Sequence, residues 1–220
     1  LGLEPNLNSN IVSSLFCKNH DQVNPLLLEK YLITEIKKLG GEIIYEKKIC
    51  KISIKQDKLV FNNQCLDFEK VVISCGAWSN EIIFNSFGID IPVRPLKGIS
   101  LDVKTISHDF YHNLWFRNIY IAPRGNGILA IGATEDERGY DSSIKMDELF
   151  FLINSMWESF PKLEDLELKK IKVGLRPTIY DGNPVIGPIE KISPNILCNF
   201  GHYRNGILLA PVTTKIICKY

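Results

Sequence analysis

The chain has 220 residues, 45% of them hydrophobic and 23% charged, which is ordinary for a folded protein able to bury a core. Its 26 Lys and Arg and 25 Asp and Glu residues leave a formal charge of +1, and this balance argues against nucleic-acid binding through phosphates. The sequence contains no apolar run of roughly 20 residues and no basic-then-apolar leader, so we expect neither a membrane partner nor secretion, and a cytoplasmic location.

The six cysteines are widely spaced and form no C-x-x-C pair. A zinc site or a disulfide framework needs patterned spacing, and several of these cysteines lie in apolar, strand-like runs such as 71–75. We therefore expect buried, reduced thiols. The cysteines are Cys17, Cys50, Cys65, Cys75, Cys198 and Cys218.

A helix is predicted over residues 25–39. Asn24 suits its N-cap, Pro25 suits the first turn, and Gly40 suits its end. Four apolar residues recur at helical spacing, so we expect one face to be buried. These residues are Leu28, Leu32, Ile36 and Leu39.

Short strands are predicted at 42–45, 49–55, 59–62 and 70–74. Asn62 and Asn63 supply a turn between two of them. The uninterrupted apolar run 71–73 is typical of a strand buried on both faces, and the small residues after it permit close approach to the backbone. The first ~90 residues are therefore predicted to form part of an α/β layer.

An antiparallel sheet is predicted in the middle of the chain. The segment 92–98 leads into a strand at 99–103, and the runs 120–122 and 127–133 are joined by a turn with a strong hairpin signal at Asn126-Gly127. An amphipathic helix follows and ends at Pro161. Its predicted buried residues are Leu149, Ile153, Trp157 and Phe160.

The last third is predicted to contain strands at 169–174 and 196–200 and a helix from 207 to the end. A polar turn with a glycine at each end, 201–206, connects the last strand to this helix. Free N–H groups and the positive end of the helix dipole meet at such a point, which suits an anion or an electron-rich ring edge. The same geometry is also common as a plain connection, and spacing alone does not separate the two interpretations.

Two further residues are candidates for substrate binding. Arg176 follows an apolar strand and precedes a proline, so its planar side chain could present a bidentate fork to a carboxylate. A surface ion pair is the equally weighted alternative. Tyr120 begins a strand, where a tyrosine is usually a core residue with its hydroxyl in water, and a hydroxyl donor to a substrate is the functional alternative.

Other patterns favour ordinary structure. His108 and His112 are four residues apart but have no third ligand nearby, so we predict no metal site. Asp102, Asp109 and the acidic run 135–137 are interpreted as solvated loop charges. The sequence contains no G-x-G-x-x-G, G-x-S-x-G or P-loop motif.

Taken together, several stretches in chain order resemble the D-amino-acid-oxidase-like FAD-dependent oxidoreductases, and within them the glycine oxidases of bacterial thiamine biosynthesis. They are 71–79, 92–98, 120–124, 131–134, 174–177 with 181–187, and 201–211. The last stretch is the most specific to the glycine oxidases. The resemblance implies a mixed α/β fold, in which an inserted antiparallel substrate-binding domain (92–178) interrupts a partial Rossmann-like FAD-binding domain (1–91 and 179–220).

The resemblance also implies a reaction and its residues. Hydride would pass from the α-carbon of glycine, a small amine or a D-amino acid to flavin N5, water would hydrolyse the imine, and oxygen would reoxidise the flavin to give hydrogen peroxide. Arg176 would hold the substrate carboxylate and Tyr120 would add a hydroxyl contact. Ile49 would meet the adenine through its backbone. The residues expected to face the isoalloxazine are His202, Tyr203, Arg204, Asn205, Gly206, Ile207 and Leu208.

The resemblance leaves several alternatives open. The family's N-terminal strand, glycine-rich loop and helix, which bind the FAD diphosphate, would precede Leu1, so we expect a fragment of a longer product or a product of gene decay or splitting. The isolated chain would then be inactive or an assembly partner of a separate FAD-binding half. A dehydrogenase of D-amino acids with another electron acceptor is the second enzymatic interpretation, and a homo-oligomer is left open.

Overall fold

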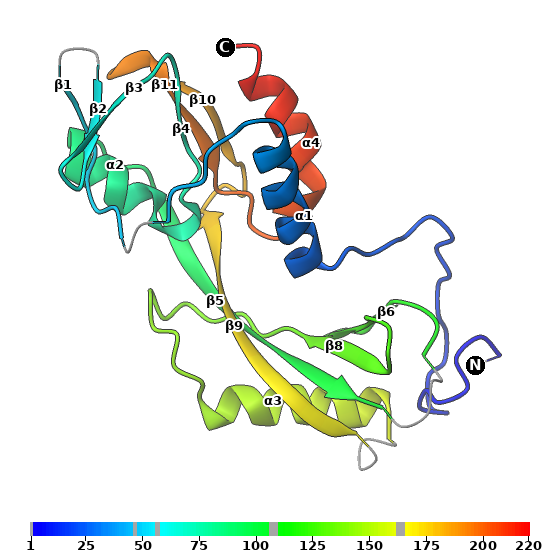
Figure 1. The fold of residues 1–220 in the computed structure, drawn as a ribbon. Helices are drawn as coiled ribbons and strands as arrows, with labels where there is room; N and C mark the ends of the chain where they lie inside the picture. The colour runs from blue at the N-terminus through cyan, green and yellow to red at the C-terminus, as the bar shows by residue number, and fades with distance from the viewer. Residues whose placement is uncertain (1, 46–47, 56–57, 106–109, 162–165) are drawn as a thin grey trace. The chain divides into compact units, whose positions relative to one another are not determined.

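The computed structural model describes residues 2–45, 48–55, 58–105, 110–161 and 166–220 (Figure 1). The helices are α1 (Pro25–Lys38), α2 (Ser79–Phe87), α3 (Met146–Ser159) and α4 (Gly206–Ile217), with a short 3-10 helix η1 (Gly76–Trp78). The strands are β1 (Ser53–Lys55), β2 (Lys58–Phe61), β3 (Gln64–Asp67), β4 (Val71–Ile73), β5 (Val93–Lys104), β6 (Leu114–Trp115), β7 (Tyr120–Pro123), β8 (Ile128–Gly132), β9 (Glu167–Ile179), β10 (Val185–Ile189) and β11 (Ser193–Phe200). Among the described helices, none is both long enough and apolar enough to cross a bilayer.

The chain divides into two compact units, which are described separately below. The first unit comprises Leu1–Glu35, Lys97–Asp136 and Asp141–Gly174. The second comprises Ile36–Leu96, Glu137–Tyr140 and Leu175–Tyr220. Strands β5 and β9 each contain residues of both units, so the chain passes between the units along extended backbone.

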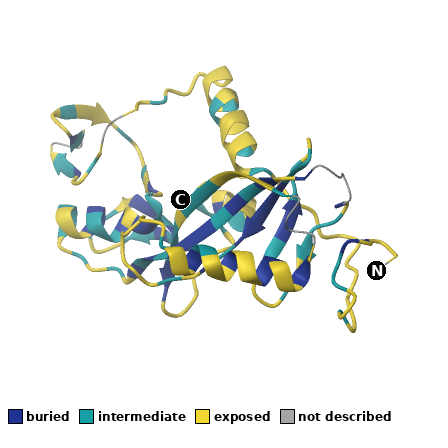
Figure 2. Ribbon diagram, turned by 90° about the horizontal axis from the view of Figure 1, so that it is seen from below, coloured by how far each residue is buried: buried dark blue, intermediate teal, exposed yellow. Residues whose placement is uncertain are grey.

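The first unit is built on a five-stranded sheet in the order β6-β7-β8-β5-β9. Pairing of β6 with β7, β7 with β8 and β8 with β5 is antiparallel, as the hairpin signal at Asn126-Gly127 predicts. Alternate residues of β5 are buried and pack with neighbouring strands against Leu152 and Met156 of α3. Figure 2 shows α3 buried toward the sheet and exposed on its outer side. This unit therefore has one apolar core between the sheet and a helix.

The prediction of the buried face of α3 is half confirmed: Phe160, just after the helix, is buried and Leu149 is partly buried against the core, but the other two residues are not. Ile153 is 50% exposed and Trp157 is 52% exposed, whereas Leu152 and Met156 are buried. The helix carries large apolar residues on two sides, because Met146 and Phe150 are also exposed. Helical spacing alone could not choose which side faces the sheet.

The second unit contains two three-stranded sheets, with the strand orders β1-β2-β3 and β10-β11-β4. In the first sheet, Asn62 and Asn63 both have positive φ (42° and 66°) and form a two-residue turn as predicted, but the strand that follows it is β3, which was not predicted. In the second, β4 and β11 pair in parallel, each leads toward a helix, and α4 packs on β10 and β11. The predicted mixed α/β class with an antiparallel sheet is therefore confirmed.

The local signals of α1 are confirmed, but its predicted burial is wrong. The side chain of Asn24 accepts hydrogen bonds from the amides of Leu26 and Leu27 (3.1 and 3.4 Å), and Gly40 adopts φ +83° just after the helix. No residue of α1 is buried, and Leu32 and Leu39 are 50% and 86% exposed. Amphipathic spacing identifies an apolar face, but it does not supply the surface that covers it.

Several strand predictions also need correction. Residues 42–45 form no strand, and the strand predicted at 49–55 is reduced to β1. Val72 of β4 is 44% exposed, whereas its neighbour Ile73, which points to the other face, is buried in the core, so the strand is not buried on both faces as predicted. We did not predict α2, β3, β6 and β10 as separate elements, because these short segments carry no strong periodic signal.

The cysteines are all free, as predicted, but most are not buried. Cys17, Cys50, Cys65 and Cys218 are exposed. Cys198 is buried in β11, and this burial raises the pKa of its thiol to about 12. That thiol is therefore unreactive at neutral pH.

Candidate functional site

The turn between β11 and α4 has a backbone that requires glycine at its start. Gly201 adopts φ +83°, and a Cβ there would lie 2.6 Å from Cδ1 of Ile179. Tyr203 has φ +53°, and its amide donates a 2.8 Å hydrogen bond to the carbonyl of Pro177 in β9. The amide of Asn205 donates to the carbonyl of His202 at 2.9 Å, which closes the turn. The turn is therefore held against the end of β9.

Helix α4 begins directly after this turn with an open N-terminus. Its N-cap, Asn205, makes no side-chain capping hydrogen bond, and the first turn contains no acidic residue. The amide of Leu209 bonds to the carbonyl of Asn205 at 2.8 Å, so the preceding amides of the first turn have no acceptor within the helix by geometry. The helix dipole adds partial positive charge at the same point.

His202 contributes a polar atom that none of the described residues satisfies. Its Nε2 is buried and has no hydrogen-bond partner among them. Burial lowers the pKa of His202 below its ordinary value of 6.5, so the ring is neutral at physiological pH. A buried, neutral ring nitrogen beside an open helix N-terminus suits a polar group of a bound molecule.

Arg176 lies in β9, one residue before the carbonyl that accepts the Tyr203 amide. Side chains alternate along a strand, so Arg176 and Ile179 point to opposite faces, and Ile179 fills the space under Gly201. Both Arg176 and the 201–206 turn belong to the second unit. The backbone hydrogen bond between Tyr203 and Pro177 thus joins the strand that carries Arg176 to the sequence-predicted turn.

Tyr120 belongs to the first unit, where it begins β7. Its register partners are Trp115 on β6 and Gly132 on β8. Register partners share one face of a sheet, so these three residues form a row across the strands. The row lies on the face opposite Ile121 and Ile131, which are buried in the core of this unit.

Ile49 lies in the second unit and is partly buried against its apolar core. We expected it at the start of a strand, but β1 begins only at Ser53. Hydrogen bonds hold the backbone on either side of Ile49. The carbonyl of Lys48 accepts one from the side chain of Asn62, and the carbonyl of Cys50 accepts one from the side chain of Asn85. Its predicted contact with the adenine stays a prediction.

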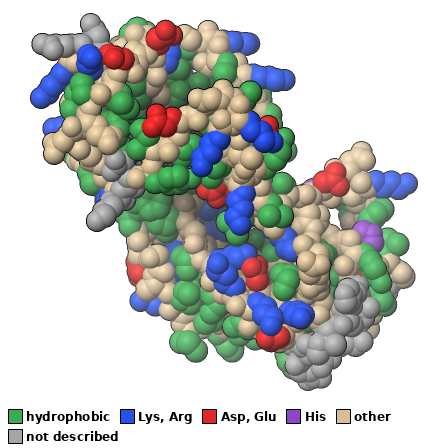
Figure 3. All heavy atoms as spheres, viewed as in Figure 1, with side chains coloured by type: hydrophobic (Ala, Val, Ile, Leu, Met, Phe, Trp, Pro, Cys, Tyr) green, Lys and Arg blue, Asp and Glu red, His purple; other side chains and the backbone are tan. Residues whose placement is uncertain are grey.

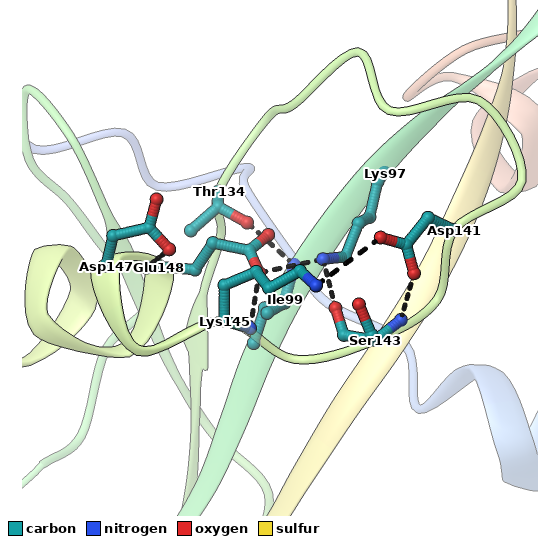
Figure 4. Close-up of polar contacts among 8 residues, drawn as sticks. All are labelled: Lys97, Ile99, Thr134, Asp141, Ser143, Lys145, Asp147 and Glu148. Carbon is teal, nitrogen blue, oxygen red and sulfur yellow. Dashed lines mark hydrogen bonds and ion pairs between the residues drawn. The ribbon is translucent and has the colours of Figure 1, made fainter.

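A buried polar cluster around Lys97, within β5, was missed by sequence reasoning. The side chain of Lys97 is fully buried, and its Nζ donates to Oε2 of Glu148 at 2.7 Å and to the carbonyl of Ser143 at 2.5 Å (Figure 4). Oε2 of Glu148 also accepts from the amide of Lys145 at 2.9 Å. A lysine is expected to be exposed unless it is paired, and no local pattern indicates its partner on α3. The cluster joins that helix to β5.

The described residues contain no cluster of His, Cys, Asp or Glu suited to a metal ion, and His108 and Asp109 lie outside them. Nδ1 of His112 instead lies 2.8 Å from the carboxylate of Glu4. Asp102, interpreted from sequence as a loop charge, lies within β5 and forms an ion pair with Lys172. On the face drawn in Figure 3, basic side chains are interspersed with acidic ones.

These features define a class of protein. A parallel β-strand leads through a glycine turn to an open helix N-terminus with an unsatisfied buried ring nitrogen, and this donor set fits the electron-rich edge of a nucleotide cofactor such as a flavin. The residues that would hold it are those of the turn and the first turn of α4. A mixed α/β protein that binds a nucleotide-like cofactor at this turn is therefore the class that the fold and the turn support.

The whole chain, residues 1–220, matches the sequence profile of the FAD-dependent oxidoreductase (DAO) family, and it belongs to that family. Membership confirms the predicted class of enzyme and the predicted cofactor, FAD, at the level of the family.

Individual relatives support the resemblance to glycine oxidases. The chain is 29% identical over 217 residues to the glycine oxidase of Bacillus licheniformis, covering 98% of this chain and 58% of the relative. It is 35% identical over 149 residues to the glycine oxidase of Pseudomonas putida, covering 67% of this chain and 40% of the relative. The crystal structure of glycine oxidase from Bacillus cereus matches with a TM-score of 0.78 at 26% identity, covering 87% of this chain and 54% of that one. The chain thus spans about half the length of the relatives it matches.

Proposed function

We propose that this chain forms the substrate-facing and flavin-facing part of an enzyme that oxidises glycine, another small amine or a D-amino acid. The FAD would accept the hydride of the substrate α-carbon and pass two electrons to oxygen, yielding hydrogen peroxide and an imine that water hydrolyses. The observation that carries the proposal is the 2.8 Å hydrogen bond between Tyr203 and Pro177, because it joins the strand of Arg176 to the turn that begins α4.

The chain's own residues would bind and orient rather than transfer protons. Arg176 would hold the substrate carboxylate with two parallel N–H donors, and Tyr120 would donate from its hydroxyl. Orientation of this kind can supply much of the rate when the cofactor performs the difficult step. The open N-terminus of α4 would stabilise negative charge that develops at the ring edge.

The remaining predictions form part of the same proposal. Residues 202–208 would face the isoalloxazine, and Ile49 would meet the adenine. Residues 1–91 and 179–220 would belong to the FAD-binding domain, and 92–178 to the substrate-binding domain. The proposal includes the cytoplasmic location expected from the composition and, from the resemblance to glycine oxidases, a role in thiamine biosynthesis.

The test is to express the full reading frame that contains this chain and to purify the product with added FAD. We expect a yellow protein that consumes oxygen and forms hydrogen peroxide with glycine or sarcosine. Reduction of an artificial dye without oxygen consumption would favour the dehydrogenase alternative instead. A product that stays colourless with FAD would reject the proposal, and the 220-residue chain purified in parallel would show whether it binds flavin alone.

A further inference from the structure

The aromatic ring of Tyr120 lies directly over the backbone of Gly132. The two residues are register partners on β7 and β8. A Cβ added at Gly132 would lie 2.9 Å from Cζ and from Oη of Tyr120, and 3.0 Å from Cε1. Contacts this short essentially never occur at real Cβ atoms. The ring can occupy its place only because residue 132 has no side chain.

A positive φ does not explain the glycine at this position. Most glycines of the chain adopt positive φ, which disfavours other residues, but Gly132 is not among them. The ring of Tyr120 by itself leaves no room for a side chain at position 132.

On the side away from β8, the ring of Tyr120 contacts another aromatic residue. Trp115, the register partner on β6, lies with its ring centroid 5.4 Å from that of Tyr120. His20 stacks on Trp115 at 5.9 Å with an interplanar angle of 14°. The segment that carries His20 is fastened to the same sheet, because Gln22 donates to the carbonyl of Pro123 and Arg124 donates to the carbonyl of Val23 at 2.7 Å.

We infer that Gly132 is a positioning residue: it sets where the hydroxyl of Tyr120 lies, with Trp115 closing the other side. This inference rests on the proposed function, in which that hydroxyl contacts the substrate. An alanine at 132 would push the far end of the Tyr120 side chain away from β8. This movement is inexpensive, because a tyrosine rotates about two side-chain bonds, so the sheet keeps its fold while the hydroxyl leaves its position.

The structural part of the inference is tested with G132A in the 220-residue chain. A crystal structure should show the Tyr120 ring displaced from β8 with the strand unmoved. In a W78F/W157F background, Trp115 is the remaining tryptophan, and its fluorescence should change in G132A but not in G174A, because Gly174 has open space and no positive φ. A ring that stays in place while β8 shifts would overturn the inference.

The functional part is tested with the FAD-loaded product of the full reading frame. The probe is glycolate, which has the carboxylate of glycine but no amine to oxidise. Loss of one neutral hydrogen bond predicts that G132A raises the glycolate dissociation constant by about 2- to 10-fold. In a Y120F background, which has no hydroxyl to displace, G132A should have no further effect, and G174A should have none in either background.

The outcomes separate this inference from the proposed function. Equal glycolate affinity of G132A and the parent, or an equal loss in the Y120F background, would overturn the positioning role of Gly132. If no variant binds glycolate, both the proposed function and the functional part of the inference fail. The position of the ring in the G132A crystal structure would still decide its structural part.

Discussion

Arg176 is the residue whose role can be measured most directly. It directly precedes Pro177, whose carbonyl is bonded to the turn at Tyr203. We predict that Arg176→Ala weakens glycolate binding by about 1.5–3 kcal/mol, the usual scale of a charged hydrogen bond. Flavin absorbance should be unchanged, and Lys170→Ala, which removes an exposed cation from the same strand, should leave affinity unchanged. Unaltered glycolate affinity in Arg176→Ala would remove this residue from the site.

Gly201 offers a test of the turn itself. Alanine there would have to adopt φ +83° and would also approach Cδ1 of Ile179 to 2.6 Å. Gly182 has a similar φ of +75° but open space around it, so Gly182→Ala isolates the conformational cost. We predict a loss of about 1–2 kcal/mol for Gly182→Ala and a clearly larger loss for Gly201→Ala. Urea unfolding of both variants measures the difference, and equal losses would mean that the packing under the turn is loose.

His202 gives the turn a predictable pH dependence. Burial lowers the pKa of this residue in the folded state below 6.5, so the unfolded chain binds a proton more readily. The stability that neutral His202 contributes is therefore fully present above about pH 6.5 and is lost as the pH falls toward the folded-state pKa. Between about pH 7.5 and pH 5.5, the parent should lose more unfolding free energy than His202→Gln. Parallel pH profiles of the two proteins would contradict this sign.

At the scale of elements, the buried pair of Lys97 and Glu148 joins β5 to the start of α3. Removing one partner leaves an uncompensated buried charge, so Lys97→Met should cost about 3–5 kcal/mol of unfolding free energy. The double variant Lys97→Met/Glu148→Leu should recover most of that loss. Lys104→Met, at an exposed position of the same strand, serves as the control. A double variant as unstable as Lys97→Met would show that the cluster is held by more than this pair.

The elements also show what local signals can and cannot predict. The ends of α1 and the two asparagine turns were predictable, because Asn24, Asn62 and Asn126 act on their immediate neighbours. The buried side of α3 and the exposure of Val72 were not, because they depend on which surface lies opposite. The same holds for the functional residues. The glycine turn could be predicted from the sequence, because its residues are neighbours in the chain. The contacts of Lys97 and Gly132 could not, because they join residues from separate strands and helices.

At the scale of the whole molecule, the exposed apolar face of α1 should be measurable. Leu32 on α1 and Leu39 just after the helix are 50% and 86% exposed, so they contribute little to the core of the chain. We predict that Leu32→Gln/Leu39→Gln lowers the binding of the dye ANS while changing the unfolding free energy by no more than about 0.5 kcal/mol. A large loss of stability would show that this face is packed in solution.

The packing of Tyr120 over Gly132 also predicts how these two positions vary among homologous sequences. Two positions that share one small volume cannot change freely in different lineages, since a side chain gained at 132 must be matched by a smaller or reoriented one at 120. Among homologous sequences, we expect paired replacements at these two sites, with tyrosine at 120 found almost wholly beside glycine at 132. Such covariation would mean that selection for the position of the Tyr120 hydroxyl also constrains the residue at 132 on the neighbouring strand.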